Sequence, residues 1–277
     1  MKEENNDDYF EKQNPSTLRS IGGLLTFSTI LPLNIYTTIE EMAKLTWFWP
    51  ILNGFIGLLA AIIAFILTRF IHFDPLLVAA IVYGFLLIIN GYNHFDGLMD
   101  FADGVMVHGD PQKKLSIMKD PMTGVGGIST AFIVGTITIA AFSSLINHAY
   151  AEGLSFLLLI IIAEMSAKIG LTTCCISSKA SNEGIGKYFI ENMDLKNYVT
   201  GLIICFIIAS ALSIKIGFHI GILGIIGGAF GGALTALLAK KHLEIANGDV
   251  LGTSNELGRL FSLLAMLILI SIFNPLI

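Results

Sequence analysis

Long apolar runs, separated by short polar segments, dominate the hydrophobic pattern of this chain. Seven of these runs reach about 18 residues or more with almost no charge, which is the length that crosses the hydrocarbon core of a bilayer as an α-helix. Strict alternation of polar and apolar positions, which marks membrane β-strands, is absent. The pattern therefore predicts seven transmembrane helices, at Phe48–Arg69, Pro75–Tyr92, Gly124–Asn147, Gly153–Ile176, Tyr198–Lys215, Ile220–Ala239 and Leu251–Phe273.

A shorter apolar segment precedes the first of these runs. Ile21–Leu33 is too short to cross a membrane and contains Pro32, so it predicts an interfacial or re-entrant helix. Residues 1–19 are polar and acidic, do not resemble a secretory signal, and predict a polar tail. The expected fold class is thus all-α: a polytopic helical bundle forming one membrane domain over residues 1–277.

Composition and charge support a lipid bilayer as the environment. Hydrophobic residues make up 54% of the chain and charged residues 13%, against about 25% charged in soluble domains. Seven spans would place twelve Lys and Arg residues on one side and only Arg69 and Lys215 on the other. Because such residues concentrate in cytoplasmic loops, the amino terminus and residues 93–123 are expected at the cytoplasmic face of the cell membrane. The net charge of −5 argues against nucleic acid as a partner.

An acidic cluster follows the second predicted span. Asp96, Asp100 and Asp103 are spaced i, i+4, i+7, which places them on one face of a helix. Like charges on one face repel each other, and no Lys or Arg occurs between residues 92 and 111 to offset them. Such carboxylates suit a hard divalent cation, Mg²⁺ in first place and Mn²⁺ in second. A solvated acidic face at the membrane surface is the alternative.

A basic segment and a glycine-rich helix start come next along the chain. Lysine side chains can pair with phosphate oxygens, and free N–H groups at a helix start favour an anion. The candidates for binding a phosphorylated substrate are Lys113, Lys114, Lys119, Gly124, Gly126 and Gly127. For Lys113 and Lys114, a role in setting membrane topology is an equally open interpretation. Lys119, beside Asp120, is the better candidate.

A second polar patch begins the last predicted span. Asp249 and Glu256 lie on one helical face with Gly252 between them. Glu256 and Arg259 fall inside the membrane boundary, where charges are costly and mark either a site or an ion pair. Glu164 and Lys168, four residues apart in the fourth span, present the same two alternatives.

These motifs carry a family resemblance. The segment "NGYNHFDGLMDFADGVMVHGDPQKKLSIMKDPMTGVGG", residues 90–127, is similar to the signature of the adenosylcobinamide-GDP ribazoletransferases, also called cobalamin synthases. Three further segments resemble other landmarks of that family in the same order: "FSTILPL" at 27–33, "WFWPILNGFIG" at 47–57 and "NGDVLGTSNEL" at 247–257.

The resemblance implies a Mg²⁺-dependent phosphotransfer. Members join adenosylcobinamide-GDP to α-ribazole or its 5′-phosphate, and release GMP and the cobamide or its 5′-phosphate. It implies metal ligation by Asp96, Asp100 and Asp103, and catalytic roles for His94 or Asp120 as proton acceptor and for Lys119 as a positive charge. The implied substrate-binding residues are Lys113, Lys114, Gly124, Gly126, Gly127, Lys168, Asp249 and Glu256. A homo-oligomer remains an open alternative.

Two other functions remain as alternatives. A CDP-alcohol phosphotransferase would use similar metal chemistry, and "DFADG" at 100–104 matches the start of its pattern, but the later positions do not. A cation transporter would also contain acidic residues within a membrane. Transporters place such sites near the bilayer midplane, whereas both acidic patches here are expected at one membrane face, which favours an enzyme.

Overall fold

The computed structural model describes residues 17–35 and 37–273, so most of the polar tail predicted for 1–19 lies outside the described residues. Over those ranges the chain forms twelve α-helices joined by short 3₁₀ and π segments. No strand occurs in them; Ala180 and Ala246 form only an isolated parallel bridge. The predicted all-α class is confirmed.

Six helical segments are long and apolar enough to cross a membrane. In each, the predicted apolar run appears as one helix or as a helix continued by a short 3₁₀ or π segment. They are Thr46–Ile71, containing α3 (Trp49–Ile66); α7 (Val125–Glu152); Leu154–Ser177, containing α8 (Leu158–Ser177); α10 (Leu195–Leu212); α11 (Phe218–His242); and α12 (Gly248–Phe273). Several apolar spans in one chain make this a multi-pass membrane protein.

The remaining predicted span is α4 (Pro75–Ile89), which is followed by α5 (Asn93–Met106) at an angle of 90°. The turn between them places Gly91 and Tyr92 in the left-handed region, with φ of 62° and 60°. Glycine adopts that conformation without strain, whereas tyrosine does so at a cost. Together α4 and α5 are long enough for one membrane segment, as a broken span or a re-entrant loop. Helix α5, which packs against α7 and α12, carries the aspartate cluster.

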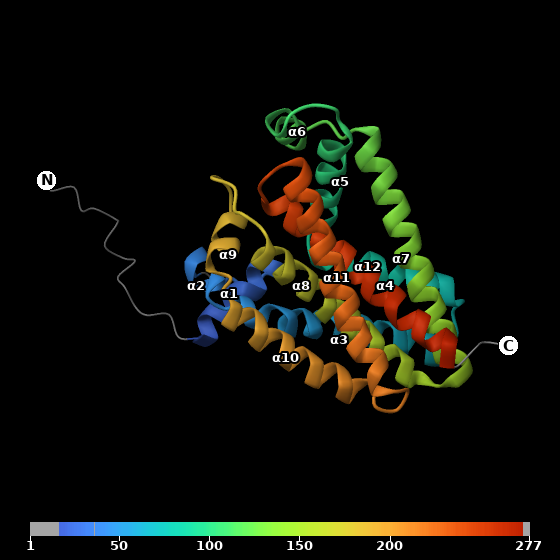
Figure 1. Ribbon diagram of the computed structural model, residues 1–277. Helices are drawn as coiled ribbons and strands as arrows, with labels where there is room; N and C mark the ends of the chain where they lie inside the picture. Colours follow the sequence, from blue (N-terminus) through green and yellow to red (C-terminus); the bar gives the residue numbers. More distant parts are fainter. Residues whose placement is uncertain (1–16, 36, 274–277) are drawn as a thin grey trace, which may run out of the picture.

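Four short helices gather at the same end of the bundle as α5, on the left and at the top of Figure 1. They are α1 (Thr17–Ser28), α2 (Ile39–Ala43), α6 (Pro111–Met118) and α9 (Gly186–Asn192). The predicted interfacial segment corresponds to α1, which ends before Pro32. The opposite end carries the last turn of α12 and the α10–α11 connection.

Helix α8 forms the centre of the bundle. Every residue from Leu159 to Cys175 is buried, between α3, α11 and α12. Close approach of the backbones explains Gly170: a Cβ there would lie 2.7 Å from the carbonyl oxygen of Ser254 and 2.9 Å from that of Gly228. This tight packing fixes the start of α12 against α8, and so fixes one wall of the site described next.

Candidate active site

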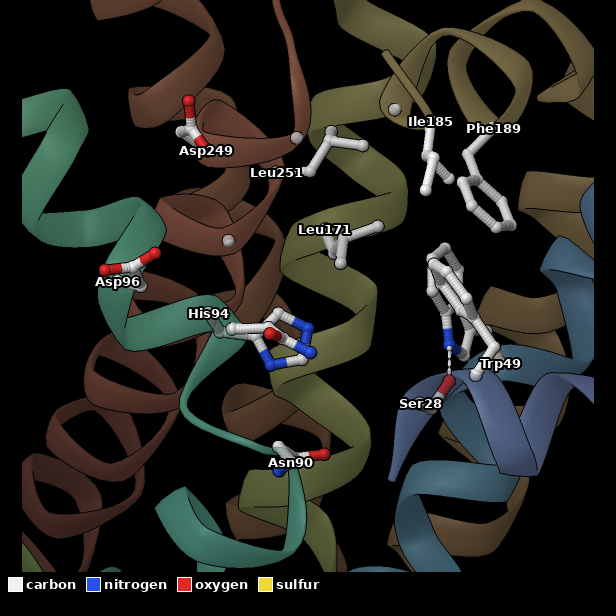
Figure 2. A pocket seen from close by; sticks show the side chains of 15 residues that line it. Ser28, Trp49, Asn90, His94, Asp96, Leu171, Ile185, Phe189, Asp249 and Leu251 are labelled. Carbon is white, nitrogen blue, oxygen red and sulfur yellow. Dashed lines mark hydrogen bonds between the residues drawn. The ribbon is translucent and has the colours of Figure 1, made fainter. Parts of the chain in front are cut away.

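A cavity of about 350 Å³ opens at the end of the bundle where the short helices lie. Its two faces differ in chemistry, as Figure 2 shows. Asp96 of α5 and Asp249 of α12 lie on one face, and Trp49 and Phe189 lie on the other. The two aromatic rings pack with centroids 4.7 Å apart, and the indole of Trp49 donates a hydrogen bond of 3.0 Å to Ser28. We call this space the inner cavity.

A second cavity, of about 630 Å³, adjoins the first and is named the outer cavity. The two share four lining residues: Ile185, Gly186, Gly248 and Asp249. The other walls of the outer cavity are largely polar and include Ser181, Asn182, Glu183, Asn247 and Lys119. A Cβ on Gly186 would lie 2.7 Å from the backbone nitrogen of Gly248, so these two segments touch and form the boundary between the cavities.

Three carboxylates from two helices form what we call the acidic ridge: Asp96, Asp100 and Asp249. Gly97 lets α5 approach α12, since a Cβ there would lie 2.8 Å from the Cα of Asp249. Partial burial, together with the negative charges of Asp96, Asp249 and Asp103, raises the pKa of Asp100 to about 6. The ridge is therefore a place where negative charge is uncompensated, as a cation site requires.

Asp103 has a different role from the one expected. Its two carboxylate oxygens accept hydrogen bonds from the backbone N–H groups of Gly124 and Gly127, each 2.7 Å long. The predicted anion at the start of α7 is thus Asp103 itself, and those N–H groups are not free for a substrate. A Cβ on Gly127 would lie 2.6 Å from Asp103, so close packing, as well as anion binding, explains the glycines, Gly126 among them.

The predicted aspartate triad is consequently not assembled as a metal cage. Over residues 17–35 and 37–273, no group of three or more His, Cys, Asp or Glu side chains stands close enough to hold a metal ion. The assignment of Asp96, Asp100 and Asp103 as ligands stays a prediction. The structure adds Asp249 to the neighbours of Asp96 and Asp100, from a segment some 150 positions away in the chain.

The basic segment contributes one lysine to the two cavities. Lys119 lines the outer cavity and lies 3.4 Å from the carboxylate of Glu183, with both side chains exposed. Lys114 is buried instead, and its Nζ contacts the Val105 carbonyl at 3.2 Å and a ring nitrogen of His242 at 3.0 Å.

Two other candidates of this region lie away from both cavities. Lys113 is exposed near the start of α6. Asp120 lines a separate cavity with Asp103 and Gly126, and its carboxylate accepts a hydrogen bond of 2.9 Å from the Met122 N–H. In this geometry neither residue is placed to contact a substrate in the inner or the outer cavity.

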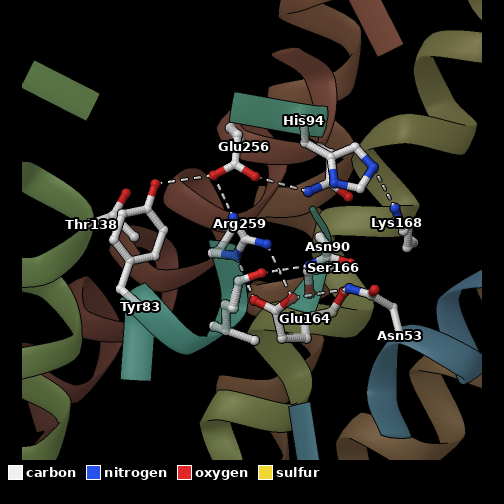
Figure 3. A network of polar contacts seen from close by, with 12 residues as sticks. Asn53, Tyr83, Asn90, His94, Thr138, Glu164, Ser166, Lys168, Glu256 and Arg259 are labelled. Carbon is white, nitrogen blue, oxygen red and sulfur yellow. Dashed lines mark hydrogen bonds and ion pairs between the residues drawn. The ribbon is translucent and has the colours of Figure 1, made fainter. Parts of the chain in front are cut away.

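Beneath the inner cavity lies a fully buried charge network (Figure 3). Arg259 bonds both Glu164 and Glu256, so the i, i+3 pairing of Glu256 with Arg259 is confirmed. Tyr83 donates to Glu256 at 3.1 Å, and Asn53 donates to Glu164 at 3.0 Å. These bonds hold α12 against α4 and α8. Glu256, which was expected to bind substrate, is therefore engaged within the protein.

Lys168 does not pair with Glu164, contrary to that alternative. Its side chain is completely buried, its Nζ lies 2.9 Å from Nε2 of His94, and it stands 5.1 Å from the ring centroid of Trp49. No acidic group forms an ion pair with it in the described part of the chain. When Lys168 is protonated it can only donate, and Nε2 of His94 then accepts while Nδ1 carries the hydrogen. With that lone pair occupied, His94 is placed as an orienting group rather than as a free base.

Several lining residues carried no chemical signal in the sequence. Trp49 and Phe189 lie in or beside apolar stretches and are indistinguishable there from ordinary core aromatics. Ser28, Asn182 and Asn247 are common polar residues, and only their position at the cavities marks them. Ser28, Trp49 and Asn247 each stood within a segment that resembles a family landmark, but nothing in those segments assigned them a chemical role.

Comparison with known proteins agrees with the resemblance drawn from the motifs. The profile of the family described as cobalamin-5-phosphate synthase matches residues 20–267. Proteins named adenosylcobinamide-GDP ribazoletransferase match over most of their length. The one from Methanosarcina barkeri is 30% identical, covering 89% of this chain and 90% of its own. That from Picrophilus torridus is 30% identical, covering 91% and 98%. No solved structure matches the chain. On these matches, the chain belongs to the cobalamin-5-phosphate synthase family.

Proposed function

We propose that this protein is an adenosylcobinamide-GDP ribazoletransferase, which carries out the last assembly step of cobamide synthesis. Family membership over residues 20–267 supports the activity. The observation that carries it at the level of the site is that a cavity with an aromatic wall and a cavity lined by a lysine share residues, among them Asp249 of the acidic ridge. Neither a CDP-alcohol phosphotransferase nor a cation transporter receives support from the family match.

The reaction exchanges one phosphorus–oxygen bond for another. A hydroxyl oxygen of the α-ribazole ribose, taken as the 3′-hydroxyl, attacks the phosphorus on the corrinoid side of the diphosphate. The bond from that phosphorus to the bridging oxygen breaks, and GMP leaves with the electron pair. The hydroxyl proton is released to water. Products are the cobamide, GMP and one proton, so atoms and charge balance.

The acidic ridge fits a Mg²⁺ ion. Mg²⁺ prefers oxygen ligands, is held by a few carboxylates, and keeps positions for water and substrate phosphates. Asp96 and Asp249 line the inner cavity, and Asp100 lies beside them on α5. Burial and the neighbouring carboxylates raise the pKa of Asp100. No three of these carboxylates form a closed set of ligands over residues 17–35 and 37–273. One or two of them would therefore hold the ion while water and the substrate diphosphate completed its shell, and the ion would supply positive charge against the diphosphate. Asp103 is the weaker candidate because two N–H groups already occupy its oxygens.

Other residues would position the substrates. Lys119 is exposed at the outer cavity, and its ammonium can exchange the Glu183 carboxylate for a phosphate oxygen. His94, held by Lys168, forms part of the inner cavity wall and restricts how a substrate enters it. The asymmetric distribution of Lys and Arg supports a site at the cytoplasmic face of the cell membrane.

Purified protein in detergent, incubated with adenosylcobinamide-GDP, α-ribazole and Mg²⁺, tests the proposal. We expect GMP and cobamide to appear in equal amounts, and excess EDTA to stop both. GMP release without cobamide would indicate hydrolysis instead. Full activity in the chelator would exclude the metal-dependent mechanism while leaving the transferase activity intact.

A further inference from the structure

The two adjoining cavities differ enough to be assigned to different parts of the substrates. We propose that the inner cavity binds the base of the nucleoside acceptor, and that the outer cavity binds the guanine nucleotide of the donor. This division rests on the proposed transferase activity. The reacting diphosphate then lies at the shared boundary of Gly186, Gly248 and Asp249. The corrin ring, far larger than either cavity, stays outside.

The inner cavity suits a flat base with few polar groups on its edges. Trp49, Phe189, Leu171 and Leu251 form its deep wall, and each is at most 4% exposed. The indole N–H of Trp49 is already bonded to Ser28, so the four side chains of this wall offer no free donor or acceptor. Elsewhere in the described lining, the one buried side-chain acceptor without a hydrogen-bond partner is Oδ1 of Asn90. A purine has polar atoms along several edges, and those that face the apolar wall would lose bonds to water without replacement. A benzimidazole-type base would lose almost none, and about 350 Å³ is room for a base of that size.

His94 adds one specific polar contact to this wall. It lines the inner cavity, and its Nδ1 is buried without a hydrogen-bond partner in the described chain. With Lys168 protonated and donating to Nε2, the hydrogen of His94 is on Nδ1. A base that offers a single acceptor nitrogen, as a benzimidazole riboside does, supplies the partner which that N–H lacks. The mouth of the cavity, with Asp96 and Asp249, can accept bonds from the ribose hydroxyls.

The outer cavity has the groups that a guanine nucleotide requires. Guanine carries N–H donors and carbonyl and ring-nitrogen acceptors, which match the carboxylate of Glu183 and the amide of Asn182. The amide of Asn247, also in the lining, is bonded to Asp249 and to the Val250 N–H. Lys119 is the one lysine or arginine among the described residues that line the two cavities, so positive charge for a phosphate is available on this side only.

The arrangement also suits the direction of the reaction. Phosphoryl transfer prefers the attacking and leaving oxygens roughly in line through the phosphorus. A nucleoside entering from the inner cavity and a GMP departing into the outer cavity place the two oxygens on opposite sides of the shared boundary. The new bond therefore forms toward the inner cavity while the old bond breaks toward the outer one.

Binding can be measured separately from turnover, because the chain has two tryptophans, Trp47 and Trp49. In a Trp47→Phe variant, the remaining Trp49 reports on the inner cavity. We expect α-ribazole to quench its fluorescence and GMP to leave it unchanged. The α-riboside of adenine should bind at least about tenfold more weakly than α-ribazole. Quenching by GMP but not by α-ribazole would reverse the assignment.

Cavity-filling variants provide the kinetic test. Leu171→Trp should raise the KM for α-ribazole by about tenfold or more and leave the KM for adenosylcobinamide-GDP within about twofold. Ile245→Trp, in the outer cavity, should do the opposite. Leu171→Met, of similar volume, is the matched control, and thermal unfolding in detergent checks each variant.

The outcomes separate the two proposals. If the wild-type protein forms no cobamide, the transferase activity fails, and the fluorescence result still decides the division of the cavities. If turnover is normal but both filled variants raise the same KM, the division is wrong while the activity stands. If a filled variant unfolds, the fluorescence assay on the Trp47→Phe protein decides alone.

Discussion

Two sets of carboxylates lie within the same bundle and differ in whether the protein supplies a cation to pair with them. Glu164 and Glu256, in the core, share Arg259 and are bonded by Asn53 and Tyr83. Asp96 and Asp100, at the bundle end, have no cation beside them and face Asp249 instead. The core set is satisfied within the protein and stabilises helix packing. In the described chain the acidic ridge has a hydrogen bond from Asn247 to Asp249 but no cation, which is compatible with the proposed Mg²⁺ site.

The largest expected effect comes from breaking the core set. Arg259→Met leaves two buried carboxylates without a cationic partner, which should destabilise the fold by about 3 to 5 kcal/mol, as removal of one member of a buried pair does. Thermal unfolding in detergent measures it. A matched control is Lys44→Met, which removes an exposed pair with Glu41 and should change stability by no more than about 1 kcal/mol. An Arg259→Met protein as stable as wild type would show that the network is not a structural requirement.

Removing a carboxylate of the acidic ridge should lower turnover and leave stability nearly unchanged. Asp96→Asn should lower turnover by about 100-fold or more, the effect of removing one group that stabilises transition-state charge. Its unfolding temperature should hardly change, because Asp96 is exposed and no bond of its side chain holds two helices together. GMP release and thermal unfolding on one preparation test both halves. Loss of stability in place of turnover would move Asp96 into the structural set.

Asp103 shares a feature with each set, because it lies near the ridge aspartates on α5 but is bonded within the protein. Asp103→Ala removes both acceptors from the start of α7 and should destabilise the protein by about 1 to 2 kcal/mol, as loss of a helix cap does. Asp103→Asn keeps one acceptor oxygen and should lose less. If Asp103→Asn instead abolishes turnover and Mg²⁺ dependence at unchanged stability, the three aspartates of α5 act together as metal ligands.

The smallest expected effect is a pH dependence. Because the pKa of Asp100 is raised to about 6 without a metal, its protonated form grows as pH falls through that value. Protons then compete with Mg²⁺. From pH 7.5 to pH 5.5 the ionised fraction falls about fourfold, so about fourfold more Mg²⁺ should be needed for half-maximal activity. The measurement is a Mg²⁺ titration at each pH, and Asp100→Asn should flatten the dependence.

Much of the fold could be predicted from local pattern. The lengths of the apolar runs predicted the crossing helices, because the bilayer sets how many residues a span needs. The short run ending at Pro32 predicted a surface helix, and α1 is that helix. The 90° turn after α4 was not predicted, since it depends on the unusual conformation of Gly91 and Tyr92 rather than on hydrophobicity.

The candidate site was predicted only in part, as the fates of individual residues show. Asp249 and Lys119 were named from sequence and do line the cavities. Lys114 and Glu256 were named on equal grounds and are bonded inside the protein. A charged residue carries the same signal in either case, and only its partners, which come from distant segments, tell the two apart.

By itself, the sequence determined the membrane helices, the surface helix and the face on which Asp96 and Asp100 lie, because each depends on neighbours within a few turns. Only the tertiary structure decided that Asp249 joins them, that Asp103 turns to α7, and that Lys168 holds His94. Those pairings span up to about 150 positions. They arise from how glycines let helices approach, and no periodicity within one segment encodes that.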